Sequence, residues 1–219
     1  MTIKQFTFNP FGENSYVVYD ETKECIIIDP GCYEKEEKDE LAQFIEENNL
    51  KVVQLINTHC HIDHVLGNAF VKDTYKVKLI IHKEDVSTLK SNEVVAPMYG
   101  FQGYEATTED EYLAEGDKVR FGNSVLDVLF VPGHAPGHIA LVNVDEKICI
   151  GGDVLFQQSI GRTDLPGGDF DTLIDSIKSK LFTLPEDVTV YCGHGPSTNI
   201  GFEKQYNPFC GVNANYSAS

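Results

Sequence analysis

Short apolar runs separated by polar breaks fill the first sixty residues, which is the pattern of strands joined by turns. Residues 15–19 and 25–28 are apolar runs, and the polar stretch 20–24 between them predicts a hairpin turn. Asp29-Pro30-Gly31 then ends the second strand. The apolar run 52–57 predicts a further, buried strand.

Helical periodicity appears between these strands. The charged stretch 34–48 carries apolar residues at i, i+3 and i+4, which predicts an amphipathic helix with one buried face. The residues of this face are Leu41, Phe44 and Ile45. A second helix is expected from Val65, and residues 78–81 predict another strand. Residues 90–116 predict a long irregular loop, either functional or held by its own aromatic side chains.

The second half shows the same alternation without repeating the sequence. Strands are predicted at 125–131 and 188–192, and the runs 139–144 and 147–150 predict a hairpin. A helix with one apolar face is predicted over residues 173–182. Two sheets with helices outside them give an α/β (α+β) fold, a four-layer αββα sandwich. Because no linker or break in composition is evident, we assign residues 1–219 to a single domain.

The polar segment after the strand at 52–57 is rich in side chains that can bind a metal ion. It places His59, His61, Asp63 and His64 within six positions. The period-2 spacing of His59 and His61 just after a strand aims both side chains the same way. Neutral imidazole and carboxylate are the ligands that zinc, iron or manganese take. Buried polar groups without a partner destabilise a fold, so a cluster of this kind has little structural use. The segment therefore predicts a metal site.

Three more loops carry residues of the same kind. His134, Asp153 and His194 each follow a predicted strand, and strand ends that meet at one edge bring together residues distant in sequence. Of the remaining histidines, His82 is expected at the surface or as a cap. His138 either orients a metal ligand or is a satisfied residue at the sheet edge.

Composition excludes several classes of partner. With 17 Lys and Arg against 34 Asp and Glu, the net charge is −17, so a nucleic-acid backbone would be repelled. The sequence has no polybasic segment that would bind an anionic membrane surface, and no apolar run long enough to span a bilayer. The N-terminal residues show no secretory signal pattern, which predicts a cytoplasmic protein. Six scattered cysteines are then expected to be reduced and buried, with Cys60 and Cys192 pointing into the core.

Taken in order, these motifs resemble those of the metallo-β-lactamase superfamily over essentially the whole chain. The segments that follow Asp153 and His194 further resemble single-domain, glyoxalase II-like (hydroxyacylglutathione hydrolase-like) hydrolases. The resemblance implies two divalent metal ions, zinc foremost, with iron or manganese as alternatives. It implies that His59, His61 and His134 hold one ion, that Asp63, His64 and His194 hold the other, and that Asp153 bridges them.

The activity implied by this resemblance is hydrolysis of a small-molecule thioester. A hydroxide bridging two metal ions would attack the carbonyl, since bound metals lower the pKa of water to about 7. Asp63 would also orient that hydroxide, and Arg162 would bind an anionic substrate unless it forms a surface ion pair with Asp164 or Asp169. The alternative is an oxidoreductase similar to the persulfide dioxygenases, with one iron held by His59, His134 and Asp153. The acyl group, the thiol carrier and the oligomeric state are left open.

Overall fold

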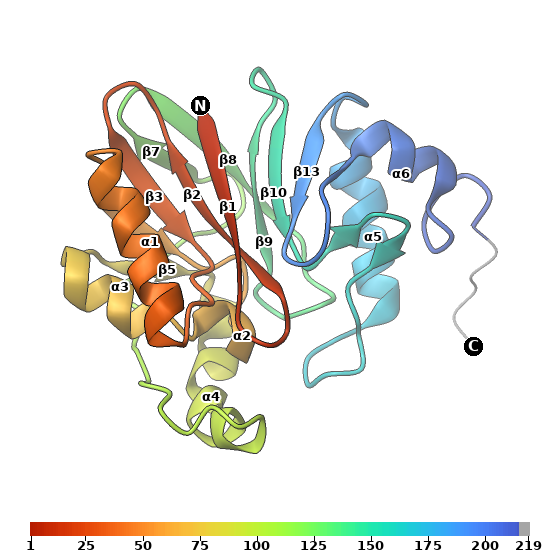
Figure 1. The fold of residues 1–219 in the computed structure, drawn as a ribbon. Helices are drawn as coiled ribbons and strands as arrows, with labels where there is room; N and C mark the ends of the chain where they lie inside the picture. Colours follow the sequence, from red (N-terminus) through yellow and green to blue (C-terminus); the bar gives the residue numbers. More distant parts are fainter. Residues whose placement is uncertain (215–219) are drawn as a thin grey trace. The chain divides into compact units, whose positions relative to one another are not determined.

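A computed structural model describes residues 1–214 of the chain (Figure 1). Its contacts divide the chain into two compact units, which we describe separately. Unit 1 comprises residues 1–113 and 120–125, and unit 2 comprises residues 114–119 and those from 126 onward. The boundary therefore passes through one β-hairpin, and the assignment of a single domain stays a prediction.

The sheet that carries most of unit 1 has six strands in sequence order. They are β1 (Thr2–Phe8), β2 (Glu13–Tyr19), β3 (Glu24–Ile28), β4 (Lys51–Ile56), β5 (Leu79–Ile81) and β6 (Glu111–Tyr112). The first three strands are antiparallel neighbours, whereas β3, β4 and β5 pair in parallel. Parallel neighbours end at the same edge of a sheet, so the segments that follow β3, β4 and β5 are delivered to one place.

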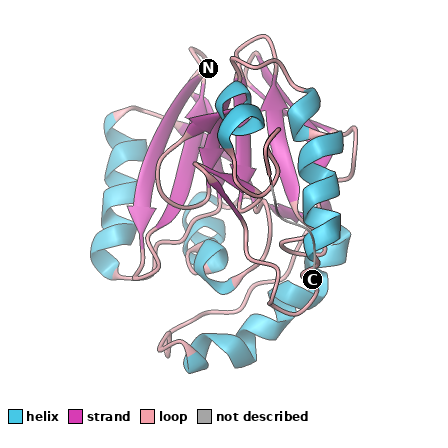
Figure 2. Ribbon diagram, turned by 90° about the vertical axis from the view of Figure 1, so that its right-hand side faces the viewer, coloured by secondary structure: helices cyan, strands magenta, loops and turns pink. Residues whose placement is uncertain are grey.

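Four α-helices accompany this sheet, and Figure 2 shows the helices in cyan beside the strands in magenta. They are α1 (Lys35–Glu47), α2 (Ile62–Val65), α3 (Asn68–Tyr75) and α4 (Val86–Met98), with a 3₁₀ turn η1 (Lys83–Asp85) before α4. Leu41 and Ile45 of α1 and Val71 of α3 pack into one core with Ile27 and Leu55 of the sheet. This core fixes the strand ends that carry the polar segments.

One expectation for this half was wrong, and another had the wrong starting residue. The stretch 90–116 is not one irregular loop, because α4 covers its first part and β6 lies within it. The buried face of α4 is formed by Leu89, the polar Asn92 and the small Ala96, so no apolar stripe marks the helix in the sequence. The helix expected from Val65 is two short helices, since α2 ends there and α3 starts at Asn68.

The second sheet has the strand order β14-β13-β10-β9-β8-β7. Its strands are β7 (Lys118–Phe121), β8 (Ser124–Phe130), β9 (Ile139–Asn143), β10 (Ile148–Gly152), β13 (Thr189–Cys192) and β14 (Thr198–Asn199). A small hairpin, the 3₁₀ turn η2 and two helices complete unit 2. These elements are β11 (Leu155–Phe156), β12 (Ser159–Ile160), α5 (Phe170–Ser179), η2 (Leu181–Thr183) and α6 (Ile200–Tyr206). Leu173 and Ile177 of α5 pack on Val142, Cys149 and Val190 of the sheet. No helix within residues 1–214 has both the length and the apolar composition needed to cross a bilayer.

A buried carboxylate, Asp20, fastens the β2–β3 turn of unit 1. Its Oδ1 accepts hydrogen bonds from the backbone and hydroxyl of Thr22, and its Oδ2 accepts from the backbone of Asn123 and the hydroxyl of Ser124. Burial alone would raise the pKa of Asp20, but these donors outweigh burial and lower the pKa to about 2. The ionised carboxylate is therefore part of the folded structure.

Replacing Asp20 by asparagine is expected to destabilise the protein at pH 7 by about 1–2 kcal/mol. Because the folded-state pKa lies below the unfolded value, the contribution is complete above about pH 4 and disappears as the pH falls through about 2. Denaturant unfolding of the wild type and the variant, both in chelator, measures the difference at each pH. The exposed Asp73→Asn serves as the control. An Asp20→Asn penalty equal at pH 7 and pH 2 would contradict this account.

Candidate metal centre

The three parallel strands of unit 1 explain how its polar residues meet. Asp29 follows β3, the segment from Thr58 to His64 follows β4, and Asp85 follows β5. All three segments therefore emerge at one edge of the sheet. The ring centroid of His59 lies 4.8 Å from that of His61 and 4.1 Å from that of His64. The four predicted residues of this segment are thus brought together.

Asp29 organises the two buried histidines of unit 1. Its carboxylate accepts hydrogen bonds from the backbone N–H of Thr58 at 2.7 Å and from the Thr58 hydroxyl at 2.5 Å. It also lies 3.2 Å from Nδ1 of His64. Because the Thr58 hydroxyl donates to Asp29, its oxygen is left to accept from Nδ1 of His59, 3.2 Å away. Both imidazoles are therefore held with the proton on Nδ1.

This tautomer has a direct consequence for metal binding. A neutral imidazole protonated at Nδ1 presents a lone pair at Nε2, which is the form that ligates a metal ion. Nε2 of His64 lies 3.8 Å from a carboxylate oxygen of Asp63. Atoms of Asp29, His59 and His64 also lie within 4.8 Å of one another. We assign Asp29 to orienting the histidines, because its oxygens already accept from Thr58 and His64.

Two side chains of the segment after β5 hold the backbone between His59 and His61. The buried Asp85 accepts a hydrogen bond from the N–H of Cys60 at 2.6 Å, and Asn92 of α4 donates to the carbonyl of Cys60 at 2.9 Å. Both backbone polar groups of Cys60, its N–H and its C=O, are therefore satisfied away from water. Sequence reasoning missed Asp85 and Asn92, because neither belongs to a motif.

A second group of contacts joins the β1–β2 turn to the same segment. Asn9 donates to the carbonyl oxygens of Gly31 and Asp63, each at 3.0 Å. The fully buried Glu13 accepts from the Ser15 hydroxyl, and its other oxygen lies 3.8 Å from Nδ1 of His64. Burial raises the pKa of Glu13 well above its ordinary value, against a smaller lowering by His64. This residue too was missed, since the β2 sequence gives no sign of its neighbours.

Strand pairing also gathers the predicted residues of unit 2. β10 and β13 are parallel, with Gly152 opposite Cys192, so Asp153 and His194 leave the sheet side by side. β8 runs parallel to β10 with the antiparallel β9 between them, which brings His134 to the same edge. One carboxylate oxygen of Asp153 lies 3.5 Å from Nε2 of His134 and 3.5 Å from Nε2 of His194.

His134 has the same tautomer as the histidines of unit 1. Its Nδ1 lies 2.7 Å from the backbone carbonyl oxygen of Arg162, and a carbonyl can only accept. In the neutral imidazole, the Nε2 lone pair then faces the Asp153 carboxylate, which is also an acceptor. A proton or a metal ion can join two such acceptors, and the imidazole and carboxylate groups are a donor set that fits a metal ion.

The two remaining predictions for unit 2 concern His138 and Arg162. Nε2 of the buried His138 accepts the backbone N–H of Asp153 at 3.0 Å, which fits the role of orienting a ligand. The Arg162 guanidinium forms two hydrogen bonds of 2.7 Å with Asp164, and this pair lowers the pKa of Asp164 to about 2. The ion pair considered from the sequence is therefore present, and substrate binding by Arg162 stays a prediction.

The cysteines and His82 behave as expected. All six cysteines are buried, and no disulfide occurs among residues 1–214. Cys60 and Cys192 belong to the hydrophobic cores of units 1 and 2, respectively, and burial raises the pKa of Cys192 to about 12. These thiols are not nucleophiles at neutral pH. His82 caps η1 by accepting the backbone N–H of Glu84 at 3.3 Å.

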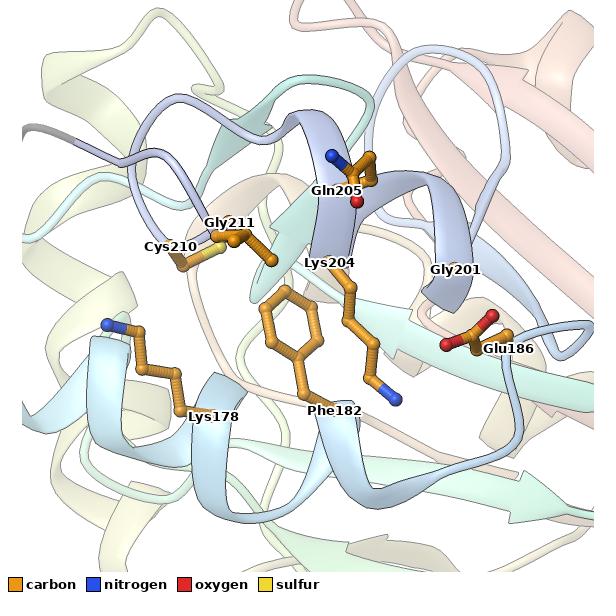
Figure 3. Close-up of a pocket in the computed structure, with 9 residues that line it drawn as sticks. Lys178, Phe182, Glu186, Gly201, Lys204, Gln205, Cys210 and Gly211 are labelled. Carbon is orange, nitrogen blue, oxygen red and sulfur yellow. The ribbon is translucent and has the colours of Figure 1, made fainter.

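A groove of about 640 Å³ in unit 2 contains none of the predicted ligands (Figure 3). It is lined by Lys178, Phe182, Glu186, Gly201, Lys204, Gln205, Cys210, Gly211 and Val212. Phe182 stands between the two lysines, one from α5 and one from α6. No residue of this groove belongs to the metal-ligand loops.

Comparison with known proteins supports the family resemblance that was based on the order of the motifs. Residues 8–194 match the Metallo-beta-lactamase superfamily. The hydroxyacylglutathione hydrolase GloC of Haemophilus influenzae is 37% identical over 211 residues, 95% of this chain and 98% of that protein. Crystal structures of the BLEG-1 B3 metallo-β-lactamase and of TTHA1623 in a di-iron-bound form have TM-scores of 0.83 and 0.84. Their sequence identities to this chain are 34% and 32%, respectively. The matched regions cover 95% and 94% of this chain and 99% of each of the two proteins. The predicted fold class is confirmed.

Proposed function

This chain belongs to the metallo-β-lactamase superfamily, and we propose that it is a metal-dependent hydrolase that cleaves thioesters, similar to the hydroxyacylglutathione hydrolases. The superfamily membership supports metal-dependent hydrolysis, and the relative from Haemophilus influenzae supports the thioester as substrate class. The observation that carries the metal-dependent part of the proposal is that Nδ1 of His59, His64 and His134 each faces a hydrogen-bond acceptor. In a neutral imidazole this contact places the lone pair on Nε2, the form that ligates a metal ion.

The ligand sets of the proposal follow the superfamily pattern. His59, His61 and His134 would hold one ion. Asp63, His64 and His194 would hold the other, and Asp153 would contact both. Within unit 2, the position of one Asp153 oxygen 3.5 Å from both histidines supports this shared role. The second set distinguishes the proposal from a one-iron site, which would have no use for the oriented Nε2 of His64.

Two divalent ions would supply a water of lowered pKa and a Lewis acid for the thioester carbonyl. The chain's own residues then have two tasks. Asp63 would orient the attacking hydroxide in addition to its place among the metal ligands. Asp29 and Asp85 hold the imidazole ligands in place through Thr58, His64 and the backbone of Cys60. No residue needs to protonate the leaving group, because a thiol has a pKa of only about 8.5.

Arg162 would meet the anionic part of the substrate. Its guanidinium already pairs with Asp164 and is exposed, so a substrate carboxylate would compete with a surface carboxylate, not with a buried one. The cost of this exchange is small, since exposed ion pairs contribute at most about 1 kcal/mol.

The test combines metal analysis of the purified protein with activity assays. The assays use S-lactoylglutathione, thioesters of other thiols, and glutathione persulfide with oxygen uptake recorded. Two metal ions per chain and metal-dependent thioester hydrolysis are expected. One iron per chain with oxygen uptake on the persulfide would instead establish the oxidoreductase alternative. A protein that binds no metal would overturn both.

A further inference from the structure

The helix α2 carries two of the predicted metal ligands but is too short to hold its own shape. It comprises only four residues, and two of them are Asp63 and His64. A helix of one turn is unstable in isolation, because few hydrogen bonds offset the ordering of its backbone. The last carbonyl groups of a helix also have no partner within it. The groups that satisfy these carbonyls therefore fix the backbone of both ligands.

The donor that would continue α2 is used elsewhere. In an α-helix the N–H of Gly67 would donate to the carbonyl of Asp63, four residues earlier. It donates instead to the carbonyl of Pro30 at 2.7 Å. A Cβ at Gly67 would lie 2.5 Å from Sγ of Cys32 and 2.8 Å from the Pro30 oxygen, so this turn is tightly packed. The Asp63 carbonyl is satisfied from outside the helix, by the side chain of Asn9.

The His64 carbonyl is satisfied by a chain of two asparagines. Nδ2 of Asn57, the residue that follows β4, donates to this carbonyl at 3.0 Å. Because a carbonyl oxygen can only accept, Nδ2 of Asn57 must face His64 and its Oδ1 must face the other way. That Oδ1 accepts from Nδ2 of Asn68, the first residue of α3, at 2.8 Å. The chain therefore holds the Asn57 amide in one orientation.

Burial makes this chain hard to replace. The side chains of Asn57 and Asn68 are fully buried, and so is His64. Water could take over the hydrogen bond of an exposed asparagine, but it has no access here. Loss of the Asn57 amide would leave the His64 carbonyl buried without its donor, which costs more free energy than the bond itself contributes. The backbone of α2 would then shift toward another donor and carry its two ligands with it.

The other two ligands of the same segment are held by different side chains. Asp85 and Asn92 satisfy the backbone of Cys60, which lies between His59 and His61. Neither of these bonds involves a group that holds α2. The backbone that carries one pair of ligands can therefore be disturbed while the other pair stays in place.

We propose that Asn57 is a positioning residue for Asp63 and His64, and that Asn68 fixes the orientation in which Asn57 acts. This inference rests on the two-metal site of the proposed function and deepens it. We call the ion assigned to Asp63, His64 and His194 the second ion, and the other one the first ion. The second ion requires Asn57, whereas the first ion does not.

Asn57→Ala tests this assignment through metal binding, without the need for turnover. Zinc per chain and both dissociation constants are measured by competition with a coloured chelator. The variant is expected to bind the first ion as the wild type does and the second ion about 10- to 100-fold more weakly. Asn48→Ala is the matched control, because Nδ2 of Asn48 donates to the Phe44 carbonyl at the end of α1, a helix without ligands. It should bind both ions normally.

Two ligand variants identify the ion that is lost. His194→Ala should keep only the first ion, and His61→Ala should keep only the second. Adding Asn57→Ala should leave the affinity of the His194→Ala protein unchanged and weaken that of the His61→Ala protein about 10- to 100-fold. A purely structural role would weaken both alike. Denaturant unfolding in chelator measures the stability of each variant without metal.

Asn68→Ala is the milder variant. It keeps the Asn57 donor and releases only its orientation, so it should weaken the second ion selectively but less. It takes the place of Asn57→Ala in both backgrounds if that variant does not fold.

The outcomes separate this inference from the proposed function. Equal weakening in the two backgrounds, or weakening in neither, overturns the positioning role. If the second ion depends on Asn57 but no thioester is hydrolysed, the role stands and the thioester activity fails. If thioesters are hydrolysed and Asn57→Ala binds both ions normally, the proposed function stands and the role is overturned. A single iron per chain that Asn57→Ala leaves unchanged overturns both.

Discussion

Asp153→Asn is expected to lower kcat/KM for S-lactoylglutathione by about three orders of magnitude or more, because metal-ion catalysis contributes several kcal/mol of transition-state stabilisation. In the proposal this carboxylate contacts both ions. Asparagine has nearly the same shape, but it is neutral and offers only one oxygen. Its oxygen would still lie among the Nε2 atoms of His134 and His194, 3.5 Å from Asp153 in the wild type. The variant should fold while losing at least one of its two ions.

The measurement pairs kinetics with metal content. Circular dichroism establishes that Asp153→Asn is folded, and elemental analysis counts the ions per chain. The matched control is Asp187→Asn, a carboxylate of unit 2 that is exposed and paired with Lys147. Because exposed ion pairs contribute at most about 1 kcal/mol, this control should keep wild-type activity and metal content. An Asp153→Asn protein with two ions and a wild-type rate would show that Asp153 does not take part.

Most strands could be predicted, because their apolar runs are short and bounded by turn residues. Residues 15–19, 25–28 and 52–57 match β2, β3 and β4 within two residues at each end. The helix α4 could not, because tertiary contacts select its buried face. Asn92 is buried there and donates to the Cys60 carbonyl, whereas Val94 and Met98 face solvent. Helix prediction from an apolar pattern assumes that the apolar residues are the buried ones. It fails for a helix that buries a polar side chain on one face and exposes apolar side chains on another.

The candidate site shows the same division between local and distant information. The ligand-type residues could be found, since the chemistry demands histidine and aspartate at the ends of strands. Of the residues that orient them, only His138 was proposed from the sequence. Glu13 and Asp85 are ordinary acidic residues in the sequence, far along the chain from His64 and Cys60, which they approach only through sheet topology. The sequence places Asp29 in a turn that ends a strand, and in the structure it contacts Nδ1 of His64 directly and reaches His59 through the Thr58 hydroxyl.

Gly161→Ala is the substitution expected to damage the unit 2 ligands most without removing any of them. A Cβ at this position would lie 1.9 Å from the backbone carbonyl oxygen of Asp153 and 3.0 Å from Nδ1 of His134. Backbone atoms cannot move aside as a flexible side chain can, so the 153–154 peptide must shift. Asp153 would move with it, and the acceptor that fixes the His134 tautomer, the carbonyl of the next residue Arg162, would be disturbed.

The expected result is a loss of metal affinity of at least about 10- to 100-fold, the cost of disturbing the groups that orient metal ligands. The strain should also destabilise the folded protein by about 1–3 kcal/mol. Competition with a chelator measures the affinity, and thermal unfolding in excess chelator measures the stability without the metal. Gly151→Ala is the matched control, because its Cβ would meet a methyl group of Val190 at 3.1 Å, which can give way, and the Tyr191 carbonyl oxygen at 3.9 Å, an ordinary contact distance. If Gly161→Ala bound metal as tightly as Gly151→Ala, Asp153 and His134 could not depend on this close backbone approach, and their convergence would have to come from strand pairing alone.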